Sequence, residues 1–151
     1  MLFNKTLPVA VVILILSACA LFFATNESYQ LSFKAKFYYE LQNYDKSYEL
    51  SKKSYELDKY NKMAQSLFKK NEDILKYKRY IAQADEYLKK IQDISKGKVG
   101  TANKERIRLI CDIMIDELDS VVSSTSDTQF LEEATKKQEI FKKLKYELFE
   151  I

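Results

Sequence analysis

The chain has 151 residues, with 25 basic and 22 acidic side chains and a formal net charge of +3. It contains no His, two Cys, two Gly and one Pro. The absence of His excludes His-based catalytic triads and His-ligated metal sites, and two Cys are too few for a disulfide scaffold or a Cys-only zinc site. The scarcity of Gly and Pro argues against turn-rich sandwiches, barrels and Gly-rich phosphate loops, so we expect an all-α protein.

We interpret residues 1–25 as a separate N-terminal segment, either a signal anchor or a lipoprotein signal. The run from Leu7 to Ala24 carries no charge, and as a helix it is about 27 Å long, close to the hydrocarbon thickness of a bilayer. Lys5 precedes the run and Glu27 is the first charge after it. Because positive charge favours the cytoplasmic side, we expect a cytoplasmic N-terminus and an exported body.

Three fates are open to this segment. It can remain as an uncleaved anchor, which places the body outside the bacterial cytoplasmic membrane, in the periplasm. The tetrapeptide that ends at Cys19, Leu-Ser-Ala-Cys, resembles a bacterial lipobox, which implies lipidation of Cys19 and an envelope lipoprotein. An ordinary signal peptidase could instead cleave after Ala20, where the sequence has an A-x-A match. The predicted membrane contact is therefore residues 7–24 or a lipidated Cys19.

From residue 26 onward, apolar side chains recur at the three- and four-residue spacing of helices. The sequence divides into a hairpin at 26–61 and a helical bundle at 62–151, which we expect to form a single body. A loop is expected at 123–128. The spacing predicts helices at about 27–41, 44–58, 62–95, 103–122 and 128–149.

Two of these predicted helices have marked apolar faces. The helix over 62–95 carries a seam from Ile74 to Ile91, and it could be one helix or two with a bend near residues 76–79. The closing helix has a packing face of Leu131, Ala134, Phe141, Leu144 and Leu148.

The stretch from Tyr44 to Asp58, YDKSYELSKKSYELD, resembles the second helix of a tetratricopeptide repeat. Ala35, Ser47 and Ser54 fall where that family needs small residues because two helices cross closely. The resemblance covers residues 28–61, as a single degenerate copy in which Gln42 replaces the turn glycine. Since one repeat cannot bury its own faces, either degenerate repeats follow or the hairpin packs on a bundle of the last three helices.

The resemblance also implies a partner-binding surface, because the first helix lines the groove in this family. The corresponding positions are Tyr29, Ser32, Lys36, Tyr39 and Glu40. Tyrosine suits such a surface since it offers a large apolar face and a polar tip.

An acidic stripe marks the helix expected at 103–122. Its members are Glu105, Asp112, Asp116 and Asp119. They share one face, opposite an apolar face that includes Cys111, so we interpret them as solvated carboxylates rather than as a cation or catalytic site. Pairing with Lys69, Lys76 or Arg79 of the preceding helix is a further possibility.

The remaining features point to a protein without enzymatic activity. Residues 61–100 carry ten basic and five acidic groups, which is too dilute for a nucleic-acid-binding arm. No constellation predicts catalytic residues, a metal or a cofactor. We therefore expect a membrane-tethered, extracytoplasmic protein-interaction module, a scaffold or adaptor of an envelope assembly, with an unknown protein partner. The alternative is a structural subunit that forms homo-oligomers through the Ile74–Ile91 seam.

Overall fold

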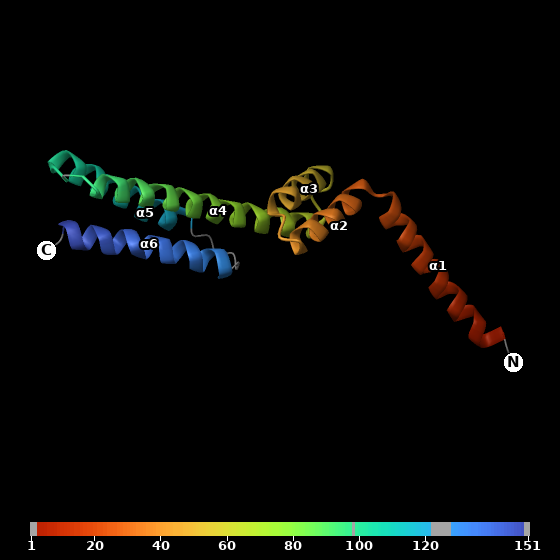
Figure 1. The fold of residues 1–151 in the computed structure, drawn as a ribbon. Coiled ribbons are helices and arrows are strands. Elements are labelled where there is room, and N and C mark those ends of the chain that lie inside the picture. Colours follow the sequence, from red (N-terminus) through yellow and green to blue (C-terminus); the bar gives the residue numbers. More distant parts are fainter. Residues whose placement is uncertain (1–2, 98, 122–127, 150–151) are drawn as a thin grey trace. The chain divides into compact units, whose positions relative to one another are not determined.

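The computed structural model describes residues 3–97, 99–121 and 128–149 (Figure 1). Within these ranges the chain forms six helices and no strand, so the predicted all-α fold is confirmed. The helices are α1 (Phe3–Thr25), α2 (Glu27–Glu40), α3 (Tyr44–Leu57), α4 (Lys62–Ser95), α5 (Thr101–Val121) and α6 (Thr128–Phe149). The long segment is one helix, α4, without an interruption near residues 76–79. The loop expected at 123–128 lies, up to residue 127, outside the described residues.

The chain consists of two compact units, residues 1–71 and 72–151. The first unit contains α1, α2, α3 and the first ten residues of α4, and the second contains the rest of α4 with α5 and α6. The sequence placed the hairpin boundary at residue 61. The compact unit extends to Asn71 because the start of α4 packs on α3, through Phe68 and through Asn71 itself.

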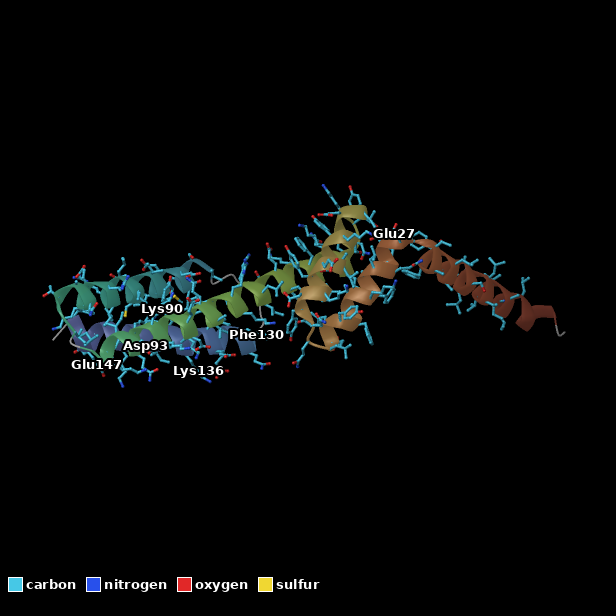
Figure 2. All side chains as sticks on the ribbon, turned by 45° about the horizontal axis from the view of Figure 1, so that its top comes forward. Glu27, Lys90, Asp93, Phe130, Lys136 and Glu147 are labelled. Atoms are coloured by element: carbon cyan, nitrogen blue, oxygen red, sulfur yellow. The ribbon has the colours of Figure 1, made fainter. Side chains whose placement is uncertain are left out.

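Helix α1 is long and apolar enough to span a membrane, and all of residues 7–25 are exposed. Its side chains extend from the ribbon without a covering layer (Figure 2). The hydroxyl groups of Ser17 and Thr25 donate to the carbonyl oxygens of Ile13 and Leu21, each at 2.8 Å. These bonds pair both hydroxyl groups with carbonyl oxygens of the same helix.

Three asparagines begin the next three helices. Asn26, Asn43 and Asn61 each accept a hydrogen bond through the side-chain oxygen from the main-chain N–H three residues later, at 3.3, 3.2 and 3.1 Å. This is the N-cap arrangement, in which a side-chain acceptor satisfies an N–H that the first helical turn leaves unpaired. Helices α2, α3 and α4 thus begin with the same capping chemistry.

Helix α2 ends in a left-handed turn at Gln42, whose φ is 58°. The N–H of Gln42 donates to the carbonyl oxygen of Tyr39 and the N–H of Asn43 to that of Tyr38, both at 2.9 Å. This pair of bonds defines a Schellman motif, which usually carries glycine at the left-handed position. Gln42 therefore occupies a backbone conformation that disfavours a side chain.

The second unit is a three-helix bundle with an apolar core, in which α4, α5 and α6 lie side by side (Figure 1). Tyr77, Met114 and Phe141 are fully buried at its centre. The Tyr80 hydroxyl donates to the carbonyl oxygen of Met114 at 3.0 Å, which joins α4 to α5. Gln138 of α6 is also buried, and its amide donates to the carbonyl oxygen of Ile115 at 2.9 Å.

The predicted packing faces of this unit are largely correct. Ala134 and Phe141 of α6 are buried, and Leu131 and Leu144 pack against the core, but Leu148 is exposed. Cys111 is buried as expected.

The acidic stripe of α5 is only partly a solvated face. Asp112 forms an ion pair with Lys145 of α6 at 2.8 Å, and Asp119 accepts a hydrogen bond from Gln138 at 2.8 Å. These partners come from α6 rather than from α4 because α6 packs along α5, while Lys76 pairs with acidic neighbours on its own helix. Glu105 and Asp116 are exposed, as predicted.

Replacing Gln42 with glycine should stabilise the hairpin. Removal of the Cβ relieves about 1–2 kcal/mol of left-handed strain, part of which is offset by the added freedom of glycine in the unfolded chain, so the net gain should be about 0.5–1 kcal/mol. Urea unfolding of the full chain in detergent, followed by circular dichroism, measures this gain. Gln42→Ala is the matched control and should gain little, since it keeps the Cβ; equal gains in both variants would contradict the strain.

The second unit should lose stability in alkaline solution. Burial, with smaller effects of Glu117 and Asp119, raises the pKa of Tyr80 from 10.0 to about 12. Burial and the neighbouring Asp112 raise the pKa of Cys111 from 9.0 to about 11. Because both groups ionise more readily in the unfolded chain, their contribution is complete below pH 9 and is lost as the pH rises towards 12.

Urea unfolding at a series of pH values tests this expectation. The double variant Tyr80→Phe, Cys111→Ala should be less stable than the wild type at neutral pH, but its stability should fall less steeply above pH 9. If the free energy of unfolding fell equally steeply with pH in both proteins, Tyr80 and Cys111 would not be the cause of the alkaline loss of stability.

Candidate interaction surface of the α2–α3 hairpin

Small side chains line the contact between α2 and α3. Ala35, Ser47, Ser51 and Ser54 have no exposed surface, and Ser28 is 3% exposed. Small residues let two helices approach closely, which larger aliphatic side chains would prevent. Ala35, Ser47 and Ser54 are the residues that the sequence assigns to small positions, and all three are buried.

The serines of the contact bond across it to main-chain groups. The Ser28 hydroxyl donates to the carbonyl oxygen of Ser54 at 2.9 Å, and the Ser54 hydroxyl donates to the carbonyl oxygen of Ser28 at 2.6 Å. Further along the hairpin, the Ser47 hydroxyl donates to the carbonyl oxygen of Ala35 at 2.8 Å. A buried hydroxyl is costly unless it is hydrogen-bonded, so these bonds allow a polar contact to replace an apolar one.

Asn61 connects this contact to the start of α4. Its side chain is fully buried, and its amide donates to the hydroxyl oxygens of Ser28 at 2.9 Å and Ser32 at 3.3 Å. Its side-chain oxygen accepts from the N–H of Ala64 at 3.1 Å. The amide also lies 3.5 Å from the hydroxyl oxygen of Ser54 in α3, so one residue caps α4 and contacts both helices of the hairpin. Ten residues later, the amide of Asn71 donates to the Ser47 hydroxyl at 2.8 Å.

Aromatic rings complete the packing of α4 on α3. Phe68 stacks on Tyr55 with ring centroids 5.8 Å apart and an interplanar angle of 12°, and its centroid lies 5.4 Å from that of Tyr48. Both tyrosines are half-buried. They thus act as packing residues between α3 and α4, with Phe68 as their shared partner.

The consequence of the serine-lined contact is an apolar exterior on α2. Phe33, Phe37 and Leu41 are 51%, 62% and 59% exposed. Their four-residue spacing places them within about 80° of one another around the helix, on the side opposite the buried serines. We call these three residues the apolar strip. The strip was not predicted, although its spacing and the serines on the other face were visible in the sequence.

The residues proposed to line the partner groove have different environments. Ser32 is fully buried, and its hydroxyl donates to the carbonyl oxygen of Tyr29 at 2.9 Å, so its assignment to an exposed groove is wrong. Tyr29 is half-buried, with its ring against Phe22 and Phe23 of α1 at 5.7 and 5.1 Å between centroids. Tyr29 therefore belongs to an aromatic cluster at the α1–α2 junction.

The other three predicted groove residues remain accessible. Lys36 and Glu40 are exposed, and Tyr39 is half-buried with its ring 5.5 Å from that of Tyr44. We call Lys36, Tyr39 and Glu40 the polar–aromatic strip. Lys36 and Glu40 adjoin the apolar strip on the outer side of α2, whereas half-buried Tyr39 lies seven residues after Ser32, close to the buried side. Of the three, tyrosine is a residue type enriched at protein interfaces. Glu27, at the start of α2 (Figure 2), instead pairs with Lys53 of α3 at 3.2 Å.

The second unit contains a groove. It lies between α4 and α5, has a volume of about 540 Å³, and is open to solvent. Tyr87, Ile94, Leu109 and Ile113 supply apolar lining. Lys90 and Arg106 also line it, and Lys90 pairs with Glu86 at 2.6 Å and lies over the ring of Tyr87. Within the described residues, no group of His, Cys, Asp and Glu side chains is arranged to hold a metal ion.

Replacing Asn61 with alanine should destabilise the hairpin more than replacing Asn43, the exposed N-cap of α3, with alanine. Asn43→Ala should cost about 1 kcal/mol, the usual value of an N-cap. Asn61→Ala removes the cap and also leaves buried serine hydroxyls without their donor, so we expect about 2–3 kcal/mol. Urea unfolding of both variants in detergent measures the difference, and equal losses would show that the buried network adds nothing to the cap.

The chain matches no family model, no curated protein and no solved structure. Its functional assignment therefore depends on the arrangement of its own residues.

Proposed function

We propose that this chain is a membrane-tethered, extracytoplasmic interaction module without enzymatic activity, a scaffold or adaptor in a bacterial envelope assembly. The observation that carries the proposal is the direct connection of an uncovered apolar helix to a hairpin with an exposed recognition surface. A single residue, Asn26, separates α1 from α2. The anchor thus holds the α2 surface close to the membrane, where a partner of the same membrane would meet it.

The tether is supported by the exposure and chemistry of α1. An apolar helix with residues 7–25 fully exposed is unfavourable in water and favourable in a bilayer. The charge order, with Lys5 before the span and Glu27 after it, supports export of the body to the periplasm. Cys19 is exposed, so attachment through a lipid on Cys19 is the alternative form of the same tether.

Three features support kinship of the hairpin with tetratricopeptide repeats. Small residues occupy the helix contact, including Ala35, Ser47 and Ser54. Gln42 adopts the left-handed conformation at the position where the family has its turn glycine. The start of α4 packs on α3 through Phe68, as the first helix of a following repeat would.

Within this proposal the polar–aromatic strip of α2 binds the protein partner. Lys36 and Glu40 are exposed, so each can form ion pairs with a partner without breaking a contact of the hairpin. The ring of half-buried Tyr39 packs against that of Tyr44, and a side chain already held in place loses less entropy on binding.

Self-association through the Ile74–Ile91 seam is the second candidate function. The seam has the helical spacing that such pairing needs, but Ile74, Tyr77 and Ala84 are fully buried and Ile91 is 7% exposed. Tyr77, Ala84 and Ile91 belong to the apolar core of the second unit. A second copy would have to displace part of that core, so the observations favour the adaptor over the oligomer.

The partner surface can be tested by site-specific photo-crosslinking in cells. A photoreactive amino acid at position 36 or 40 should give a discrete crosslinked product with another membrane or envelope protein. The same amino acid in place of Lys52, an exposed residue of α3, is the matched control and should give a weak product or none. Identical patterns at the three positions, or a product with the mass of a dimer, would contradict the adaptor.

The tether itself is tested by membrane fractionation of the same cells. The full chain should sediment with membranes and resist alkaline extraction, and its intact mass should retain Met1 if α1 is an uncleaved anchor. A mass beginning at an acylated Cys19 would instead identify the lipid-anchored form. Recovery of the protein in the soluble fraction would overturn the tether.

A further inference from the structure

We propose that the apolar strip of α2, formed by Phe33, Phe37 and Leu41, lies in the lipid headgroup layer and holds the hairpin on the membrane surface. The inference rests on the proposed membrane tether, but it assigns a separate surface and a lipid ligand. The polar–aromatic strip adjoins it and shares Lys36 as a border residue, while Glu40 stays available to a protein partner.

The first argument is the reversed amphipathicity of α2. A helix on a soluble body normally buries its large apolar residues and exposes its polar ones. Helix α2 buries Ser28, Leu31, Ser32 and Ala35, and it leaves Phe33, Phe37 and the C-cap residue Leu41 more than half exposed. The buried face of α2 is therefore mostly small and polar, while the more apolar face points outward and would be stabilised by an apolar environment outside the hairpin.

The second argument is continuity with the membrane helix. The N–H of Asn26 donates to the carbonyl oxygen of Phe22 at 3.0 Å, so the main chain passes from α1 into α2 with scarcely a break. The ring of Phe23 lies 5.1 Å from that of Tyr29 and 6.4 Å from that of Phe33. Aromatic contacts therefore connect the end of the apolar span to the first residue of the strip, where membrane proteins concentrate aromatic side chains.

The third argument is one of length. The headgroup region of one leaflet is roughly 5–8 Å thick, whereas α2 is about 21 Å long. If α2 left the membrane along its normal, Phe37 and Leu41 would stand in water. If α2 runs along the surface, all three residues of the strip reach the boundary between headgroups and acyl chains, as in interfacial amphipathic helices.

The fourth argument is the placement of charge. Lys34 and Lys36 are exposed and border the strip on its two sides. Long lysine side chains can extend from an embedded apolar face to the phosphates of the headgroup layer. Neither lysine takes part in an ion pair within the described residues. A protein partner would also cover an apolar strip, but the contact with the span and the flanking lysines favour lipid.

The proposal can be tested with a single tryptophan, because the chain has none. Phe37→Trp places the reporter in the strip, and Tyr60→Trp places it at a residue of the same unit that is 88% exposed. Each full-length variant is reconstituted in vesicles of phosphatidylethanolamine and phosphatidylglycerol, with or without lipids brominated near the top of the acyl chain. Phe33→Trp provides a second reporter in the strip, and circular dichroism checks that each variant is folded.

We expect the lipid quencher to act on the reporter at position 37 and the aqueous quencher to act on the reporter at position 60. The reporter at position 37 should emit at shorter wavelength, should be quenched by brominated lipid, and should be quenched several-fold less by iodide than the reporter at position 60. Equal quenching by iodide at positions 37 and 60 would overturn the proposal. So would protection of position 37 in native envelope membranes but not in pure lipid, since that result would identify a protein as the occupant.

The same samples separate this inference from the tether. If the strip is exposed to iodide while the chain still resists alkaline extraction, the headgroup contact is wrong and the anchor stands. If the chain is released by alkaline extraction, the anchor fails together with the contact that depends on it.

Discussion

The close contact between α2 and α3, made by serines, determines most of what the first unit can do. Ser28 and Ser54 exchange hydrogen bonds with each other's carbonyl oxygens across the contact. Such bonds form only when two helix backbones are near each other, and that proximity requires side chains no larger than serine or alanine. Leu31 is the large apolar residue that α2 buries, whereas Phe33 and Phe37 lie on the opposite side of the helix and, with Leu41, form the outward-facing strip.

The buried polar network also gives the hairpin its specificity. An apolar contact tolerates small shifts in register, whereas Asn61 must meet Ser28, Ser32 and the N–H of Ala64 at once. A partly satisfied network is unfavourable in a low-dielectric interior, so alternative registers are disfavoured. The side-chain oxygen of Asn71 finds no partner in the described structure, which makes it the least satisfied member of the network.

The second unit reaches stability by a different route. Its core is apolar and centred on Tyr77, Met114 and Phe141, with polar contacts such as Gln138 and the Asp112–Lys145 pair joining α5 to α6. The long apolar seam of α4 is used largely within this core. The two units therefore differ in what they bury. The hairpin buries polar side chains and exposes apolar ones, whereas the bundle buries most of its apolar side chains.

The sequence alone determined the properties that depend on local spacing. The uncharged run of residues 7–24, the helical periodicity and the limits of most helices follow from the order of side chains and from caps such as Asn43. Tertiary structure decided which faces are used. Ser32 is buried because Asn61, far along the chain, reaches its hydroxyl, and Asp112 pairs with Lys145 because α6 packs along α5. These outcomes depend on which helices meet and at what distance, and the periodicity of one helix carries no information about its neighbour.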